Sequence, residues 1–209
     1  MTLLPTHNSS DNPDPPVPLA PDPPREPSDG ALIVASRERP ELFSVLFDRH
    51  SGALYRHVSR RVGPEAAEDV VAETFLVAFR KRGRYDPAYP VALPWLYGIA
   101  TRLVARHRRE ETTRYRAFSR AHTSPSVAAE DERVVTDLTA VSAGPSLAAA
   151  LAALSQGDRD VLLLIAWADL TYEETARALS IPVGTVRSRL NRARRRTRAA
   201  LGVNPLELD

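Results

Sequence analysis

Apolar residues recur every three or four positions along three successive stretches of the N-terminal half, which is the spacing of one buried face on an amphipathic helix. These stretches cover residues 41–63, 64–83 and 95–110. Glycine suits the end of a helix and proline its first turn, so Gly63, Pro64 and Gly83 mark the boundaries. No stretch alternates apolar and polar residues for long enough to predict a strand. We therefore expect residues 36–110 to form one all-helical domain.

The helical pattern returns near Leu147 and predicts a second, smaller domain over residues 147–203. Ser155 is a good N-cap for a helix that starts at Gln156. The stretch between the domains, residues 111–146, loses the periodicity and is rich in Ser, Thr, Ala and acids, which predicts a linker. The expected fold is all-α: two small helical domains joined by a flexible linker, followed by a short tail at 204–209.

The stretch TYEETARALSIPVGTVRSRLNRARRR, which begins at Thr171, predicts two short helices joined by a tight turn. Thr171 and Glu174 form a capping box, in which each side chain satisfies a free backbone N–H of the helix start. Pro182 cannot lie inside a helix but can begin one. Two helices joined by a turn, with a basic second helix, are typical of the helix-turn-helix, whose second helix enters the major groove of DNA.

The second of these helices places polar and arginine side chains opposite its apolar stripe of Val183, Val186, Leu190 and Ala193. Arginine binds phosphates and is the best bidentate partner of guanine, so this outer face predicts contacts with duplex DNA. The predicted contact residues are Thr185, Arg187, Ser188, Asn191, Arg192 and Arg195. The alternative is a solvated basic helix in an unrelated bundle. The absence of any acid over residues 181–200 favours DNA.

The N-terminal segment differs in composition from the rest of the chain. Residues 1–30 hold nine of the eighteen prolines and a net charge of −4. Too little apolar surface is present there to offset the cost of ordering the chain. We expect residues 1–35 to be a disordered, proline-rich tail, either a solvated extension or a partner-binding segment.

Basic residues gather in two blocks on a chain whose formal net charge is only +2. Residues 101–122 sum to +5 and residues 181–200 to +7. Two such blocks predict two contacts with a polyanion. Of the 28 basic residues only Lys81 is a lysine, a bias that either codon usage or a need for forked phosphate contacts explains.

Several classes of chemistry find no support in the sequence. The chain has no cysteine, which excludes disulfides and thiolate zinc sites. His50 and His57 could share a helix face, but ordinary surface or core histidines explain them better than a metal site. No nucleophile–base set and no glycine-rich phosphate loop is present, so we expect no enzyme activity, no catalytic residue, no metal and no cofactor. No signal peptide and no membrane span is visible, which predicts a soluble, cytoplasmic protein.

Two stretches together resemble a known family. LS…DRDVLLLIAWADLTYEETARALSIPVGTVRSRLNRARRRTRAAL, over 154–201, strongly resembles the C-terminal promoter-binding domain, region 4, of bacterial sigma factors. Within 42–109, AEDVVAETFLVAFR and LPWLYGIATRLVARHRR resemble the core-polymerase-binding and promoter-melting segments of region 2. This ordered pair with a short linker is similar to the extracytoplasmic-function (group IV, ECF) type of the sigma-70 family. The resemblance implies a protein that binds core RNA polymerase and directs promoter-specific transcription initiation.

The resemblance also implies which residues of region 2 meet the polymerase. The second long helix of the family docks on a coiled coil of the largest polymerase subunit. The matching positions here are Asp69, Glu73, Thr74, Phe75 and Arg80. Phe75 is either an interface anchor or a core residue. Ala72 replaces the glutamine that the family usually has, which removes one expected polar contact, whereas Phe79 in place of tryptophan preserves bulk.

The minus-ten promoter element would be read as a single strand, which requires aromatic platforms and a basic track. The matching residues are Tyr85, Tyr89, Trp95, Tyr97, Arg102, Arg106, Arg108 and Arg109. Trp95 is either such a platform or a packing residue, and Arg102 stands where asparagine is frequent in the family. The minus-thirty-five element would be read by the helix-turn-helix face named above, while Arg196 and Arg198 would touch phosphate or the polymerase flap.

Two other classes of protein remain to be weighed. A stand-alone helix-turn-helix regulator would explain the C-terminal half nearly as well, but it gives residues 64–109 no role. A small helical enzyme would require a catalytic constellation that the sequence lacks. The family often pairs with an anti-sigma factor, so such a partner is possible here too.

Overall fold

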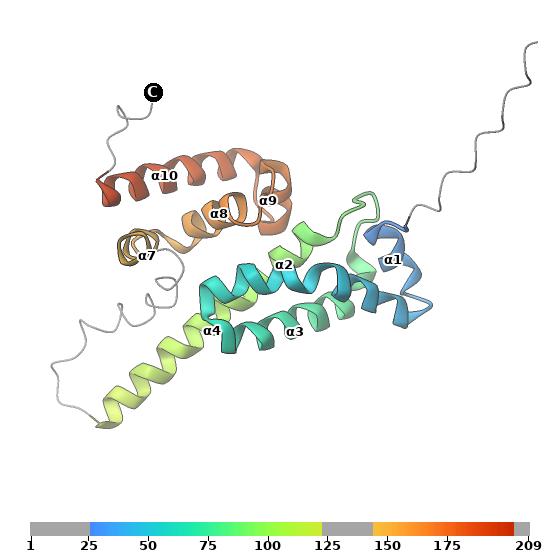
Figure 1. The fold of residues 1–209 in the computed structure, drawn as a ribbon, viewed down its shortest axis with the longest axis horizontal. Coiled ribbons are helices and arrows are strands. Elements are labelled where there is room, and N and C mark those ends of the chain that lie inside the picture. The colour runs from blue at the N-terminus through green and yellow to red at the C-terminus, as the bar shows by residue number, and fades with distance from the viewer. Residues whose placement is uncertain (1–25, 123–143, 203–209) are drawn as a thin grey trace, which may run out of the picture.

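The computed structural model describes residues 26–122 and 144–202, and this part of the chain contains helices and turns but no strand (Figure 1). The all-α prediction is confirmed. The N-terminal elements are α1 (Asp29–Ala35), η1 (Pro40–Phe43), α2 (Ser44–Val62), α3 (Pro64–Lys81), η2 (Arg82–Arg84) and α4 (Leu93–His122). The C-terminal elements are α7 (Pro145–Ala152), α8 (Gln156–Ala166), α9 (Tyr172–Leu179) and α10 (Val183–Leu201).

Helices α2, α3 and α4 form the N-terminal bundle, and α2 and α3 are joined by a single residue, Gly63. Its φ of 82° lies in a region that glycine adopts without strain, and Pro64 then begins α3 with its φ already set. Side chains from the bundle fill a shared core, in which Leu54, Val58 and Leu96 are fully buried. Lys81, the last residue of α3, is exposed.

Helix α1 lies within residues that we expected to be a disordered tail, so the prediction is wrong for Asp29–Ala35. The Ser28 hydroxyl accepts a hydrogen bond from Ala31 N at the start of the helix, and Leu32 and Ile33 are buried in the bundle core. The short apolar run therefore offsets the cost of ordering the chain, which the proline-rich composition around it concealed. Residues 1–25 lie outside the described part, so the tail prediction stands untested there.

Asp29 ties this helix to the rest of the bundle. Its carboxylate accepts from Ala92 N at 2.9 Å and contacts His50 Nε2 at 2.7 Å and Arg49 Nη1 at 3.1 Å. Burial by itself raises the pKa of the Asp29 carboxyl, but the Ala92 amide and the two neighbouring bases outweigh burial and hold it below its ordinary value. His50 therefore holds α2 to α1 through its contact with Asp29. Among the described residues no group of three or more His, Asp and Glu could hold a metal ion.

Helix α4 continues to His122, past the predicted start of the linker at 111. The Thr112 and Thr113 hydroxyls donate to the carbonyls of Arg108 and Arg109 one turn earlier, at 2.9 and 2.8 Å. The pair Arg106–Glu110, at 3.4 Å, adds a favourable i,i+4 contact. The extension is mostly polar, and its large apolar residues Tyr115 and Phe118 are exposed, so it lacks the long apolar period on which the prediction relied. The predicted linker residues 123–143 lie outside the described part.

Helices α7 to α10 form the C-terminal unit, which contains the predicted helix-turn-helix. The Ser155 cap is present, with its hydroxyl accepting from Asp158 N at 3.3 Å, and both halves of the capping box between Thr171 and Glu174 form. The turn passes through Ser180, whose φ of 56° is left-handed, and α10 buries Val186 as predicted.

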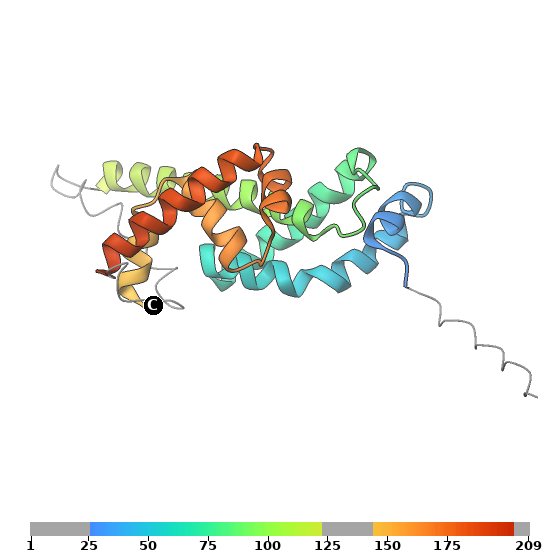
Figure 2. The same ribbon diagram turned by 90° about the horizontal axis from the view of Figure 1, so that it is seen from above.

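The two units pack directly on each other, with α9 lying against the first half of α4 (Figures 1 and 2). Helices α9 and α4 approach so closely that a Cβ added to Gly98 would lie 2.2 Å from the carbonyl oxygen of Ala178. Leu164 and Leu170 join the core of the N-terminal bundle. Arg61 of α2 forms a buried ion pair with Asp160 of α8.

Candidate functional site

The residues predicted to meet the polymerase lie along α3, but only some are available at the surface. Asp69 and Arg80 are exposed and Glu73 is half-buried. Thr74 is fully buried, and its hydroxyl donates to the carbonyl of Val70 at 2.7 Å. Thr74 therefore fixes the helix instead of presenting a polar group to a partner.

Phe75 lies in the core, with 7% of its surface exposed, and packs edge-to-face on Phe47 with ring centroids 4.9 Å apart. Phe47 is 46% exposed, and Leu76 of α3 is 47% exposed. Sequence reasoning missed this exposed apolar pair. A signal was present, because Leu76 is a large apolar residue that lies off the buried stripe of α3, and such a residue must face outward.

Glu73 and Arg106 connect the predicted polymerase contacts to the predicted DNA contacts. Arg106 Nη2 donates to both Glu73 carboxylate oxygens, at 2.8 and 2.6 Å, from α4 to α3. The hydrogen bonds to Glu73 raise the pKa of Arg106 above its ordinary value. The two side chains sit at the surface, so a partner that takes up either one has to break this pair.

Two of the four aromatic residues predicted to face minus-ten DNA are core residues. Tyr85 is buried, and its hydroxyl donates to the carbonyls of Tyr89 and Val91 at 2.7 and 3.1 Å. Burial, with the nearby Asp29 charge, raises the pKa of Tyr85 to about 12. Tyr97 is also buried. Trp95 is half-buried and packs in a tilted arrangement on Tyr85, with the ring centroids 5.0 Å apart. Tyr85 therefore shapes the loop from within, whereas Tyr97 packs on His57 of α2.

Tyr89 is the exposed aromatic residue of this set, and a residue from the C-terminal unit lies on it. The Arg177 guanidinium of α9 stacks 3.8 Å from the centre of the Tyr89 ring, and Arg102 Nη1 donates to the carbonyl of Ala178 at 3.4 Å. Burial lowers the pKa of Arg102. Helix α9 thus covers part of the surface that was predicted to read single-stranded DNA.

Arg108 and Arg109, although adjacent in sequence, lie in different surroundings. Arg108 Nε and Nη2 donate to the carbonyl of Arg61, at 3.2 and 2.6 Å, where the two units meet. Burial, together with the neighbouring charges of Arg61 and Arg159, lowers the pKa of Arg108 to about 10. Arg109 is exposed. Of this pair, Arg109 is the one open to a nucleic acid in this arrangement.

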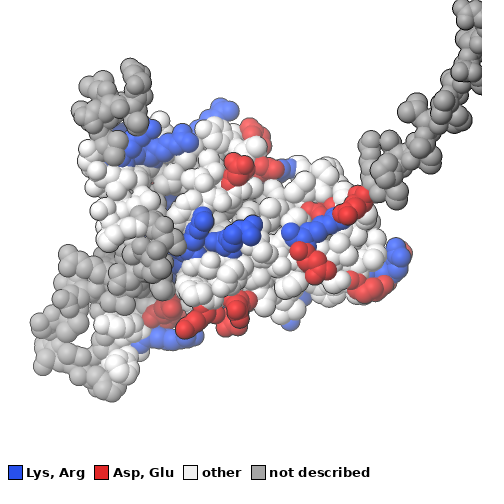
Figure 3. Space-filling model, viewed as in Figure 1, with Lys and Arg blue, Asp and Glu red and all other residues white. Residues whose placement is uncertain are grey.

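The predicted DNA face of α10 is open to solvent, and basic side chains run along this helix in Figure 3. Arg187, Ser188, Asn191 and Arg195 are exposed, and Thr185 is half-buried. Arg192 differs, because its guanidinium makes a two-pronged ion pair with the buried Asp158 carboxylate of α8, at 2.8 and 2.7 Å. These hydrogen bonds hold the pKa of Asp158 below its ordinary value.

The sequence matches two family models in the order that this geometry suggests. Residues 46–114 match sigma-70 region 2, and residues 146–197 match sigma-70 region 4. The chain is 31% identical over 196 residues to the ECF RNA polymerase sigma factor SigE of Mycolicibacterium smegmatis, covering 89% of this chain and 72% of SigE. This chain belongs to the ECF type of the sigma-70 family. It is also 27% identical over 186 residues to the sigma factor SigK of Mycolicibacterium vanbaalenii, covering 84% of this chain and 89% of SigK.

Two solved structures share the fold of this sigma factor. CnrH, in complex with the cytosolic domain of CnrY, aligns with a TM-score of 0.58 at 24% identity, covering 84% of this chain and 98% of CnrH. RpoE, in complex with the anti-sigma factor NepR from Bartonella quintana, aligns with a TM-score of 0.53 at 25% identity, covering 81% of this chain and 99% of RpoE. Within the described ranges, no helix is both long and apolar enough to cross a bilayer.

Proposed function

We propose that this sigma factor binds core RNA polymerase through α3, contacts the minus-thirty-five element through α10 and engages the melted minus-ten element through the loop before α4. The observation that carries the proposal is the exposed, acid-free face of α10. A helix that presents Arg187, Ser188 and Asn191 to solvent behind a capped first helix suits the major groove.

The polymerase contact is assigned to the exposed part of the α2–α3 face. Asp69 and Arg80 supply charges that can meet opposite charges across an interface, which gives orientation and specificity. Phe75 is a core residue, the second of its two predicted roles, and Phe47 and Leu76 supply the apolar centre of the interface, since both are nearly half exposed beside it. Phe75 supports Phe47 from below.

The minus-ten contact is assigned to Tyr89 and Arg109, with Trp95 and Arg102 joining them once α9 has moved away from α4. An exposed aromatic ring beside arginines is what binding to a single strand requires. Tyr85 holds the loop in shape from the core, and Tyr97 is a core residue of α4.

We further propose that an anti-sigma factor regulates this protein, since CnrH and RpoE were both solved with a protein partner. The protein works in the cytoplasm and catalyses no reaction of its own. A stand-alone regulator is disfavoured, because the region 2 match would have no role in it.

In vitro transcription with core polymerase and a genomic promoter library tests the proposal. The wild type should yield defined transcripts that depend on the protein, and Asp69→Arg should lower their yield at least about tenfold, as expected for a charge reversal at an interface. Glu41→Arg, an equal charge change at an exposed position of η1, should leave the yield unchanged. Duplex binding without polymerase association would instead support the regulator.

A further inference from the structure

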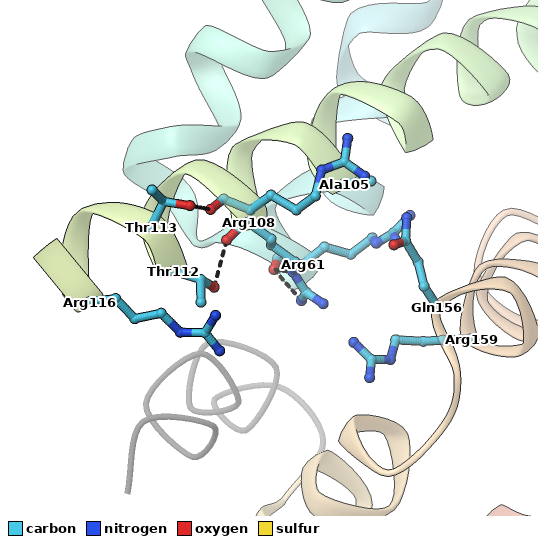
Figure 4. Close-up of a pocket in the computed structure, with 9 residues that line it drawn as sticks. Arg61, Ala105, Arg108, Thr112, Thr113, Arg116, Gln156 and Arg159 are labelled. Carbon is cyan, nitrogen blue, oxygen red and sulfur yellow. Dashed lines mark hydrogen bonds between the residues drawn. The ribbon is translucent and has the colours of Figure 1, made fainter. Parts of the chain in front are cut away.

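A cavity of about 320 Å³ lies where the N-terminal bundle meets α8 (Figure 4). Five arginines from three helices line it: Arg61 of α2, Arg108, Arg109 and Arg116 of α4, and Arg159 of α8. In Figure 4 the guanidinium groups of Arg116 and Arg159 point toward each other from opposite sides, with Arg108 between them. The cavity thus collects cations from both units of the molecule.

The acids that the structure describes around this cavity do not balance its positive charge. None of the described residues that line it is acidic. Asp160 is engaged with Arg61, and Glu111 acts on Arg108 from one side. Burial and the charge of Arg61 lower the pKa of Arg159, as burial and two like charges do for Arg108. Like charges held together away from water are unfavourable unless an anion joins them.

Arg61 adds an independent sign that something binds here. Its side chain is 2% exposed, and Nη2 is bonded to Asp160. The other two nitrogens, Nε and Nη1, are buried without a hydrogen-bond partner among the described residues. A buried donor left unpaired is rare, because it loses water without gaining a replacement. Because both nitrogens have almost no accessible surface, an acceptor in the cavity would satisfy them once the Arg61 side chain turns toward it.

We propose that this cavity binds a small phosphate-bearing anion, such as pyrophosphate or a phosphate monoester. Phosphate oxygens accept from guanidinium groups in forked pairs, so one anion can bridge several of these arginines. The volume equals that of roughly ten liquid waters, which suits a hydrated small anion. A DNA duplex cannot reach Arg61 while the two units are packed together, because that side chain lies inside the interface.

Binding here would couple a ligand to the arrangement of the two units. Arg108 and Arg116 belong to α4 and Arg159 to α8, so an anion held by all three joins the units. In the arrangement seen here, α9 covers part of the predicted minus-ten surface. Anion binding would raise the population of this closed arrangement and lower that of an open arrangement, in which α9 has left α4. The anion would therefore oppose promoter binding.

Titration calorimetry of the full chain with pyrophosphate, at constant ionic strength, tests this site. Arg116 is exposed, so Arg116→Gln removes a charge from the cavity without disturbing the core. Arg114→Gln is the matched control, because it removes an equal charge from α4 at a different surface pocket. We expect saturable binding by the wild type, about tenfold weaker binding by Arg116→Gln, as for the loss of one charge-assisted hydrogen bond, and unchanged binding by Arg114→Gln.

Three outcomes would overturn the site. Absence of saturable binding rejects it, and equal losses in the two variants reduce it to general attraction by a basic helix. Fluorescence titration of both variants with a short DNA duplex separates the two sources of phosphate. If Arg116→Gln weakens duplex binding as much as pyrophosphate binding while Arg114→Gln does not, these arginines belong to a DNA-backbone surface.

Discussion

His57 shows how a single buried base makes the stability of this protein depend on pH. The ring is 2% exposed, packs edge-to-face on Tyr97 at 5.0 Å, and has no hydrogen-bond partner for either nitrogen among the described residues. Burial first, and then the charges of Arg61 and Arg60, lower its pKa from 6.5 to about 3. The imidazole is therefore neutral in the folded protein throughout the physiological range.

This shift predicts a loss of stability in mild acid. Between pH 6.5 and about 3 the unfolded chain binds a proton at His57 that the folded chain does not, so the free energy of unfolding falls as pH falls below 6.5. From pH 7 to pH 5 the His57 contribution should decrease by about 2 kcal/mol. Urea unfolding at both pH values, with His57→Phe beside the wild type, measures it. The variant should lose less stability, and equal losses would exclude His57 as the cause.

At the scale of elements, the ion pair of Arg192 with Asp158 holds α10 to α8, so Arg192 has a structural role. Its guanidinium is neutralised by Asp158, whereas Arg187 on the same helix is exposed. Both arginines were predicted to contact DNA, and the helical spacing that put them on one face could not distinguish them. The distinction depends on Asp158, which is 34 positions away from Arg192 in the sequence.

The two arginines should therefore respond differently to substitution. Arg187→Gln should reduce the slope of log binding constant against log salt concentration by about one, because one phosphate contact is lost. Arg192→Gln should change that slope less but lower the thermal midpoint, because it leaves the Asp158 carboxylate buried without its partner. Salt-dependent binding to a promoter duplex and thermal melts of both variants check this. Identical behaviour of the two variants would contradict it.

Elements with a strong apolar period or a cap were predictable from sequence, and those that depend on distant contacts were not. Thr171 and Glu174 are three positions apart, so their capping box could be predicted directly. Helix α1 needs Ala92, 63 positions from Asp29, and the extension of α4 is mostly polar, with its large apolar residues Tyr115 and Phe118 exposed. The candidate surfaces followed the same rule, since the exposure of Phe47 and the burial of Thr74 depend on packing among helices.

At the scale of the whole molecule, the contact between α9 and α4 is the feature that links regions 2 and 4. The helices can approach because Gly98 has no side chain. The neighbouring atoms are backbone, so they cannot rotate away as a side chain would. Any residue larger than glycine must push the helices apart.

Gly98→Ala should accordingly loosen the two units. Small-angle X-ray scattering should give a larger radius of gyration than for the wild type, by a few ångströms, and titration with single-stranded DNA should show no weaker binding. Gly52→Ala is a matched control, because this exposed glycine of α2 meets only the flexible end of Arg56, 3.6 Å from an added Cβ. Unchanged scattering for Gly98→Ala would mean that the units adjust without separating.

The exposed residue at the end of α3 has a practical consequence. Lys81 is the one lysine of the chain, so its amine is the one side-chain amine that amine-reactive reagents can modify. It follows Arg80, within the face proposed to meet the polymerase. A fluorophore coupled there would report docking by a change in its emission, with no substitution in the protein. By the same reasoning, any lysine acetylation of this protein must occur at Lys81, which borders the surface proposed to bind the polymerase.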